Sequence, residues 1–504
     1  MSGRTIALLL FAALVLAGLI LTYLAGRRSR TAGEFWAAGG GISPTRNAIA
    51  TLGDLMSGSA LLGGIGLMFL VGYDSLLYLV LPLLAWIPVM LLVAERLRNL
   101  GEYTLTDVLV RRFRSGSLRT VLAVSTLAIS GLYLLAQVVV AGNLFTLLSG
   151  TGYPVAVVVT GVIMVAYVGL GGMHGATVIQ VVKAVLLIGV LAGLTVLLLV
   201  RFGGDVGGMV ARAVAPAGCL DPLRPGNLLK DPWDLLSVAL AGTLGVAGLP
   251  HVMMRIFTVR DAVHARRSVT VTVALLTVAT VLIAFVGLGA SALLRNETKE
   301  LAASGGNLVA PRLAELLGGA PTLGIVSAIA FATVLAVVAG LLVNASSAVV
   351  RDIWPSRAGD EVRRAKRTTV AIGVVVVVVA IALGPTFNAT LLVTLAFAVA
   401  ASANVPVLLF TLTWRRFTTT GAITGVLTGL TAAVVLMLLG PTLWPGEHPP
   451  ISLSAPTLIA LPLGVLGCVV GTVLSRRAPA GDFAAIQIES ELGRGARATA
   501  ESAR

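Results

Sequence analysis

The sequence predicts an all-α polytopic membrane protein, and three observations support this fold class. Hydrophobic residues make up 57% of the 504 residues, charged residues make up 12%, and the mean hydropathy is +0.98. A soluble domain carries about 25% charged residues. Most of the chain also divides into apolar runs that reach the roughly 17–25 residues needed to cross a bilayer. We therefore expect a multi-pass protein of the cell membrane.

Thirteen apolar runs are long enough to be membrane spans. The first follows a lone Arg4, is too long for the apolar part of a signal peptide and has no cleavage pattern before Arg27, so we expect a retained helix. The runs cover about 6–25, 47–71, 75–94, 119–148, 154–172, 177–200, 233–254, 268–293, 321–350, 368–385, 388–413, 417–440 and 452–475. Residues 1–475 are thus expected to form a single transmembrane domain.

The basic residues predict the orientation of the chain. With the N-terminus outside, 27 of the 36 Lys and Arg residues fall on the inside, 8 fall outside, and Lys183 lies within a span. This imbalance places the C-terminus inside. Because the arginines are scattered among short loops, the net charge of +14 is a topology signal and indicates no nucleic-acid partner. We expect a short surface helix near 103–113 and a disordered polar tail over 476–504.

An interruption in the second run is the strongest indication of function. Residues 53–59 read Gly-Asp-Leu-Met-Ser-Gly-Ser within an otherwise apolar segment. A carboxylate inside the bilayer is costly and usually functional. Glycines and small polar residues let a helix unwind and expose carbonyl groups to an ion. The pattern indicates a solute transporter.

A second interruption suggests internal symmetry. Spans 2–6 and 7–11, about 47–200 and 233–413, fit two inverted five-helix repeats that each open with a broken helix. Span 7 carries a Gly/Pro cluster at 242–250, where Pro250 removes helical hydrogen bonds. An alternative is that the glycines only allow close helix packing. Packing alone does not explain Asp54 or Pro250, so we predict a binding site where the breaks meet.

Several stretches resemble the sodium/solute symporter family, in particular its acetate or monocarboxylate permease branch. The resemblance covers about residues 6–475. It implies a leucine-transporter-like fold, with one helix before the repeats and two after them, and cation-coupled uptake of a small solute. The stretches are 48–57, 72–74, 94–104, 133–137, 171–187, 248–259 and 331–340.

The resemblance also implies a position for a coupling sodium ion, where the break in span 2 meets span 9. The backbone carbonyls of Gly53 and Met56 match two ligands of the sodium-coupled members, and carbonyl oxygen suits a hard cation. The two hydroxyl ligands of those members fall on Ala336 and Val337, which have no hydroxyl. Thr333, one helical turn before Ala336, is the available substitute.

Two coupling ions therefore stay open at this point. One possibility is a rearranged sodium site made by Gly53, Met56 and Thr333. The other is proton coupling through Asp54, whose pKa burial would raise. A family aspartate in span 6 matches Gln180, which is uncharged. No cofactor beyond the sodium ion or proton is expected.

The candidate substrate-binding residues are polar groups that fall inside spans. A carboxylate substrate needs donors such as helix N-termini, hydroxyls or a cation. Gln180 and Lys183 share one face of span 6 and can hold an anion or pair with Asp54. The alternatives are that Lys183 snorkels to the inner interface and that Gln137 makes only a helix-to-helix hydrogen bond. The candidates are Asp54, Ser57, Ser59, Gln137, Gln180 and Lys183.

Two basic or titratable residues after the second break are interpreted differently. His251 and Arg255 follow the break in span 7 and fit an inner gate or a topology anchor better than substrate ligands. The scarcity of other polar groups at mid-depth indicates a small substrate, because the many hydroxyls of a sugar would be left unsatisfied. An acid of about two to four carbons fits better.

The sequence thus predicts a secondary active, cation-coupled symporter that imports acetate or a related short monocarboxylate. Proline or pantothenate is the alternative solute within the same family. A sensor is disfavoured because the polar tail is too short for a kinase, and a lipid-modifying enzyme would need a cluster of His, Asp or Glu near one interface. A passive channel would be recognised by flux that ignores ion gradients.

Overall fold

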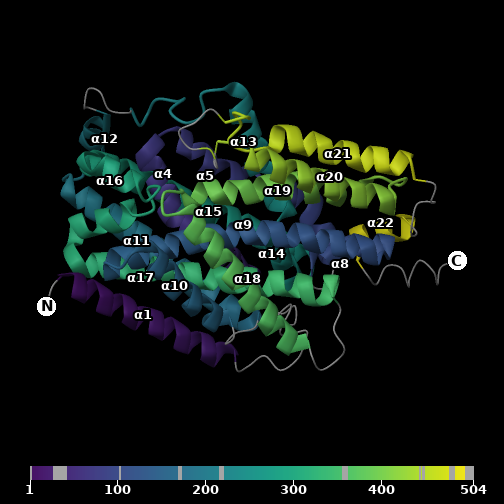
Figure 1. The fold of residues 1–504 in the computed structure, drawn as a ribbon, viewed down its shortest axis with the longest axis horizontal. Coiled ribbons are helices and arrows are strands. Elements are labelled where there is room, and N and C mark those ends of the chain that lie inside the picture. The colour runs from purple at the N-terminus through teal and green to yellow at the C-terminus, as the bar shows by residue number, and fades with distance from the viewer. Residues whose placement is uncertain are drawn as a thin grey trace.

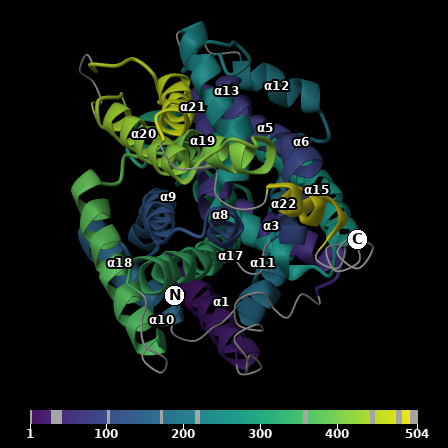
Figure 2. The same ribbon diagram turned by 90° about the vertical axis from the view of Figure 1, so that its right-hand side faces the viewer.

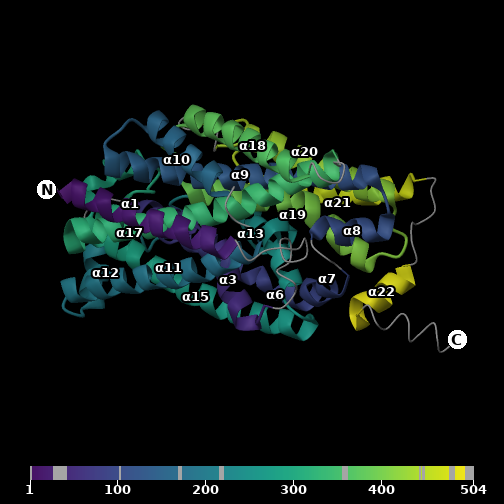
Figure 3. The ribbon, with the colours of Figure 1, turned by 90° about the horizontal axis from the view of Figure 1, so that it is seen from below.

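The computed structural model describes residues 3–26, 42–100, 104–168, 173–214, 221–354, 361–441, 444, 449–475 and 483–493. These residues form helices, and within them the only strand-like pairing is an isolated bridge between Ile42 and Val259. Most long helices run along one axis of the molecule (Figures 1 and 3). Helix α1 (Gly3–Gly26) begins at one end of this axis and α22 (Phe483–Leu492) lies at the other.

The elements follow the order that the two predicted repeats require. The first repeat region contains α3 (Pro44–Leu55), η2 (Ser59–Gly63), α4 (Gly64–Val71), α5 (Asp74–Leu84), α6 (Trp86–Pro88), η3 (Val89–Val93), α7 (Ala94–Leu100), α8 (Leu105–Phe113), α9 (Gly116–Ser149), α10 (Tyr153–Val168) and α11 (Met173–Arg201). The second contains α13 (Pro232–Gly245), η4 (Val246–Gly248), α14 (Pro250–Met253), η5 (Met254–Thr258), α15 (Ala262–Leu293), α17 (Val309–Ser347), η7 (Ala348–Ile353), α18 (Glu361–Leu383) and α19 (Ala389–Thr413). Helices α20 (Thr419–Leu438) and α21 (Thr457–Val473) follow the repeats, and α12 (Val206–Val214) and α16 (Thr298–Ala302) lie in the two long loops.

The all-α prediction is confirmed for the described residues. Eight helices there are long and apolar enough to cross a membrane, and two bent pairs raise this number to as many as ten. The bent pairs begin at Pro44 and Pro232 and turn by 60° and 46°. Three shorter apolar helices, at Thr5–Ala17, Tyr153–Ala166 and Thr457–Val473, match the remaining predicted runs. The total of thirteen spans and the orientation stay predictions.

The interior of the bundle is formed by helices from both repeats. In α19, 94% of the most apolar stretch is buried inside the protein, whereas in α18 the share is 17%. Figure 2, which looks along the bundle, shows α19 near the middle and α18 at the margin. A helix that is apolar on all sides is buried or faces lipid. We infer that α18 faces lipid and that α19 belongs to the core around the broken spans.

The predicted surface helix near 103–113 is present as α8, but its arginines do not all face outward. Arg112 is 1% exposed. Its guanidinium donates to carbonyl oxygens in the last turn of α19 and in the residues that follow it, where a helix runs out of N–H donors of its own. The acceptors are Phe410 (3.2 Å), Thr411 (2.6 Å), Trp414 (2.8 Å), Arg415 (2.9 Å) and Phe417 (3.3 Å). Burial disfavours the charged form and lowers the pKa of Arg112 to about 10.

The prediction of a disordered tail is wrong for one segment. Residues 483–492 form α22, which packs on α7. Arg111 and Glu489 make an ion pair of 2.6 Å, and the Asn99 side chain donates to the carbonyl of Ser490 at 2.8 Å. These partners of the segment lie far away in sequence. The other residues of the predicted tail, 476–482 and 494–504, lie outside the described residues.

The Arg112→Met variant is expected to unfold more easily. It leaves buried carbonyls at the end of α19 without a charged donor, and hydrogen bonds to charged groups contribute roughly 1.5–3 kcal/mol. We expect the midpoint of thermal unfolding in detergent to fall by several degrees. Arg416→Met, which removes an exposed guanidinium, is the matched control. Equal midpoints for the two variants would contradict this role of Arg112.

Candidate functional site

The first break lies at the end of α3 and has a defined geometry. Met56 has φ −79° and ψ 75°, and the Ser57 N–H donates to the carbonyl of Leu55 at 2.9 Å. This is an inverse γ-turn, in which the bond spans two residues rather than four. Gly53 therefore lacks the helical donor that Ser57 would supply in a continuous helix. The chain resumes as the π-helical turn η2 after a bend of 60°.

The glycines of this segment also allow close packing, as the alternative explanation proposed. A Cβ atom on Gly53 would lie 2.6 Å from the backbone oxygen of Gln180 on α11. A Cβ atom on Gly58 would lie 2.3 Å from the Val334 side chain on α17. The break is thus held tightly between α11 and α17. Packing and unwinding occur in the same segment and do not exclude each other.

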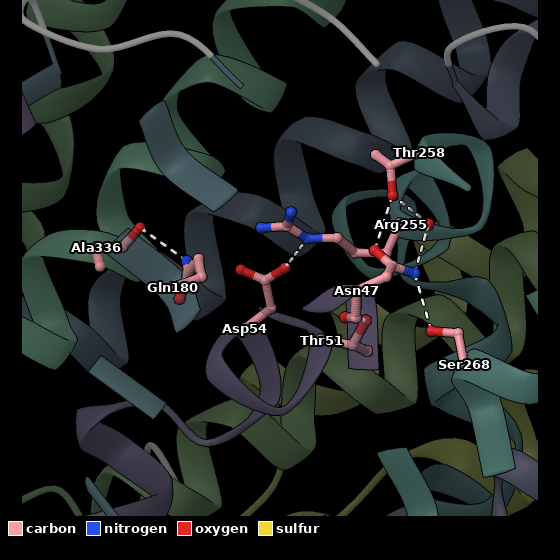
Figure 4. Close-up of polar contacts among 8 residues, drawn as sticks. All are labelled: Asn47, Thr51, Asp54, Gln180, Arg255, Thr258, Ser268 and Ala336. Carbon is pink, nitrogen blue, oxygen red and sulfur yellow. Dashed lines mark hydrogen bonds and ion pairs between the residues drawn. The ribbon is translucent and has the colours of Figure 1, made fainter. Parts of the chain in front are cut away.

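The two broken spans meet at a buried ion pair. The carboxylate of Asp54 on α3 pairs with the guanidinium of Arg255 on η5, and the residues are 8% and 4% exposed (Figure 4). A polar network extends from this pair. The Asn47 amide donates to the Arg255 carbonyl at 3.1 Å and to the Ser268 hydroxyl at 3.0 Å. The Thr258 hydroxyl donates to the Asn47 side-chain oxygen at 2.7 Å.

Arg255 is the partner of Asp54 that sequence reasoning did not find. The sequence suggested Lys183 as the basic partner and assigned Arg255 to a gate or a topology anchor. Asp54 and Arg255 are 201 positions apart in the sequence, and no local pattern relates them. A hint was available in the inverted repeats, because each partner stands next to the break of its own repeat.

Ser57, Ser59 and Gln137 form a second polar group. The Gln137 amide nitrogen, on α9, donates to the Ser57 hydroxyl at 3.3 Å and to the Ser59 hydroxyl at 3.0 Å. The two hydroxyl oxygens are 2.5 Å apart. Gln137 therefore does make a helix-to-helix contact, but the contact orients the two hydroxyls of the break. Its own side-chain oxygen is buried and has no hydrogen-bond partner.

Gln180 and Lys183 form a third group between α11 and α17. The Gln180 amide donates to the carbonyl of Ala336 at 3.2 Å, and the Lys183 ammonium donates to the carbonyl of Thr333 at 3.4 Å. Lys183 is 3% exposed, so it does not snorkel to an interface. The Thr333 hydroxyl donates to the carbonyl of Ile329 at 2.7 Å. The roles of Gly53, Met56 and Thr333 as ion ligands remain predictions.

A small cavity lies beside the first break. It has a volume of about 60 Å³. The Trp86 side chain at its wall is 2% exposed, and its indole N–H has no hydrogen-bond partner. The wall is formed by Leu55, Met56, Ser59, Ala60, Tyr78, Leu79, Pro82, Leu83, Trp86, Tyr133, Leu276, Thr390, Val393, Thr394 and Phe397. Sequence reasoning missed the aromatic residues of this wall, since aromatic residues within apolar spans carry no distinctive pattern.

Two broken helices that meet at buried polar groups beside a small cavity define a secondary transporter with inverted repeats. Residues 35–429 match the family described as the sodium:solute symporter family. A relative in Bacillus subtilis (strain 168), named uncharacterized symporter YwcA, is 41% identical over 505 residues and covers 97% of this chain and 98% of its own. The chain belongs to the sodium:solute symporter family.

Solved transporters share the fold. A Na⁺-coupled sialic acid symporter in a substrate-bound outward-open state has a TM-score of 0.74 at 15% identity, over 94% of this chain and 98% of that chain. Mhp1, a nucleobase-cation-symport-1 family transporter in a closed conformation, has a TM-score of 0.55 at 12% identity, over 87% and 93% of the two chains. At sequence identities this low, the similarity to these structures shows only that this chain has the same fold.

Membership of this family confirms the broader predictions made from the sequence. The chain is a cation-coupled symporter for a small molecule and a multi-pass protein of the cell membrane. The family and the shared fold indicate a transporter. Two of the stretches that carry the resemblance lie partly outside the described residues, at 101–103 and 171–172.

The Asp54–Arg255 pair can be tested without knowledge of the substrate. Removal of one partner leaves an uncompensated buried charge, which costs roughly 3–5 kcal/mol. We expect Asp54→Asn and Arg255→Gln each to lower the unfolding midpoint strongly, and the double variant to lose much less than their sum. Glu300→Gln, which removes an exposed carboxylate, is the control. Additive losses in the double variant would show that the two side chains act independently.

Proposed function

We propose that the chain imports acetate or a related short monocarboxylate by cation-coupled symport. The observation that carries this proposal is the volume of the cavity at the first break, about 60 Å³. Sites for drug-sized ligands measure about 300–1,000 Å³. A cavity needs at least about 10–15 Å³ of such space to hold one water molecule. The cavity therefore suits a ligand of only a few non-hydrogen atoms.

The lining of the cavity has the two kinds of surface that such an acid needs. Leu79, Val393 and Phe397 provide an apolar wall for a methyl or short alkyl group. The indole N–H of Trp86 has no hydrogen-bond partner and can donate a hydrogen bond to a carboxylate oxygen. None of the lining residues is an acid, which would repel the anion.

Ser59 supplies a further donor through its contact with Gln137. The Gln137 amide hydrogens occupy one acceptor position on each serine oxygen. When Ser57 donates its hydroxyl hydrogen to Ser59, the hydrogen of Ser59 is left without a partner inside this group. Because Ser59 lines the cavity, that hydrogen can bind the carboxylate. Gln137 then orients the donor without touching the substrate.

Uptake of labelled acetate into proteoliposomes tests this function. Acetic acid crosses lipid unaided, so initial rates must be corrected with protein-free liposomes. An inward sodium gradient and an inward proton gradient are imposed in separate experiments. We expect saturable uptake that propionate and pyruvate inhibit and that proline and pantothenate leave unchanged. Saturable proline or pantothenate uptake without acetate uptake would contradict the substrate assignment.

Trp86→Phe is expected to raise the KM for acetate by about tenfold while the amount of protein in the membrane is unchanged. The variant keeps the aromatic wall and removes one donor to a charged ligand, which is worth at least about 1.4 kcal/mol or one factor of ten. Trp233→Phe is the matched control, because Trp233 is 63% exposed. An unchanged KM in Trp86→Phe would exclude a contact between the indole and the carboxylate.

A further inference from the structure

The residues at the predicted sodium position do not fit a sodium ion. Gly53 and Met56 provide carbonyls on one side, but Ala336 and Val337 on the other side have no hydroxyl. The α17 carbonyl of Thr333 accepts from the Lys183 ammonium. One turn along, the carbonyl of Ala336 accepts from the Gln180 amide. Nitrogen donors from α11 thus contact the α17 backbone on the side where the two hydroxyl ligands are missing.

We propose that the ammonium group of Lys183 takes the place of the coupling sodium ion between α3 and α17, so that substrate binding and uptake need no sodium. The proposal rests on the function proposed above and concerns the position of one positive charge. A tethered ammonium provides the same charge as a sodium ion and donates to the same kind of oxygen. Its contact with the Thr333 carbonyl also links α11 to α17.

The charges around Lys183 support this assignment. Asp54 from α3 and Arg255 from η5 are the charged groups that act on it. They are paired with each other, so Lys183 brings one positive charge beyond a neutral pair. The basic residues of α15 lie in its first turns, with Arg266 paired to Glu95.

Electrostatic repulsion makes the lysine and a sodium ion alternatives. The Lys183 nitrogen is 3.4 Å from the carbonyl oxygen of Thr333. A cation bound to the same oxygen at about 2.4 Å would lie within roughly 6 Å of that nitrogen. At this separation, repulsion in a protein environment weakens ion binding by on the order of a hundredfold. A proton then remains as the cation whose gradient drives accumulation.

The first test uses the unaltered protein. Initial rates of acetate and pyruvate uptake are measured in proteoliposomes with sodium chloride or choline chloride on both sides, with and without an inward proton gradient. We expect equal rates in sodium and choline. Uptake that requires sodium would overturn the proposal and leave the substrate assignment intact. Absence of saturable uptake of any short monocarboxylate under either gradient would instead refute the proposed function, and the lysine proposal with it.

The second test removes the positive charge of Lys183 and adds hydroxyl groups that can bind a sodium ion from the solution. Lys183→Met is expected to lower uptake at least tenfold in choline, whereas Lys366→Met, an exposed lysine, leaves it unchanged. Adding Ala336→Ser and Val337→Ser to Lys183→Met places hydroxyls on α17, and this triple variant is expected to gain stimulation by sodium of several fold. Wild-type rates in choline for Lys183→Met would overturn the proposal. If Lys183→Met does not fold, the sodium comparison in the unaltered protein still decides.

Discussion

The ion pair between Asp54 and Arg255 is the interaction on which the arrangement of the two broken spans depends. Each break interrupts a helix inside an apolar bundle, where unsatisfied polar groups are costly. The pair joins one break to the other, and Asn47 ties the Arg255 backbone to Ser268 on α15. Polar groups of the two breaks therefore partner one another across the interior. A change at one break must be transmitted to the other, as alternating access in an inverted-repeat transporter requires.

The short segment between α3 and η2 links the two proposed binding positions. Met56 lines the cavity, and its carbonyl is one of the predicted ion ligands. Ser59 contributes to the cavity wall, and Gly53 packs directly on Gln180 of α11. Occupation of the cavity and the charge between α3 and α17 thus act on the same few residues. This shared segment provides a physical basis for coupling between the substrate and the positive charge.

The sequence predicted what depends on local pattern and missed what depends on distant contact. The lengths of the apolar runs predicted the helices. The Gly/Ser cluster at 53–59 and the Gly/Pro cluster at 242–250 predicted the two breaks. The grouping of Ser57 with Gln137 was also within reach, because few polar residues occur at that depth. Arg255 as the partner of Asp54, Trp86 at the cavity and the helix at 483–492 were not, since each is decided by residues far away in the chain.

Direct measurement of sodium binding tests the central claim, that the positive charge between α3 and α17 belongs to the protein. Binding of ²²Na⁺ to the purified transporter can be followed by scintillation proximity in the presence of acetate, with unlabelled sodium as the competitor. This measurement needs neither a membrane nor a gradient. The account predicts no saturable binding. Saturable ²²Na⁺ binding that unlabelled sodium displaces would contradict it and would require Lys183 to leave the Thr333 carbonyl.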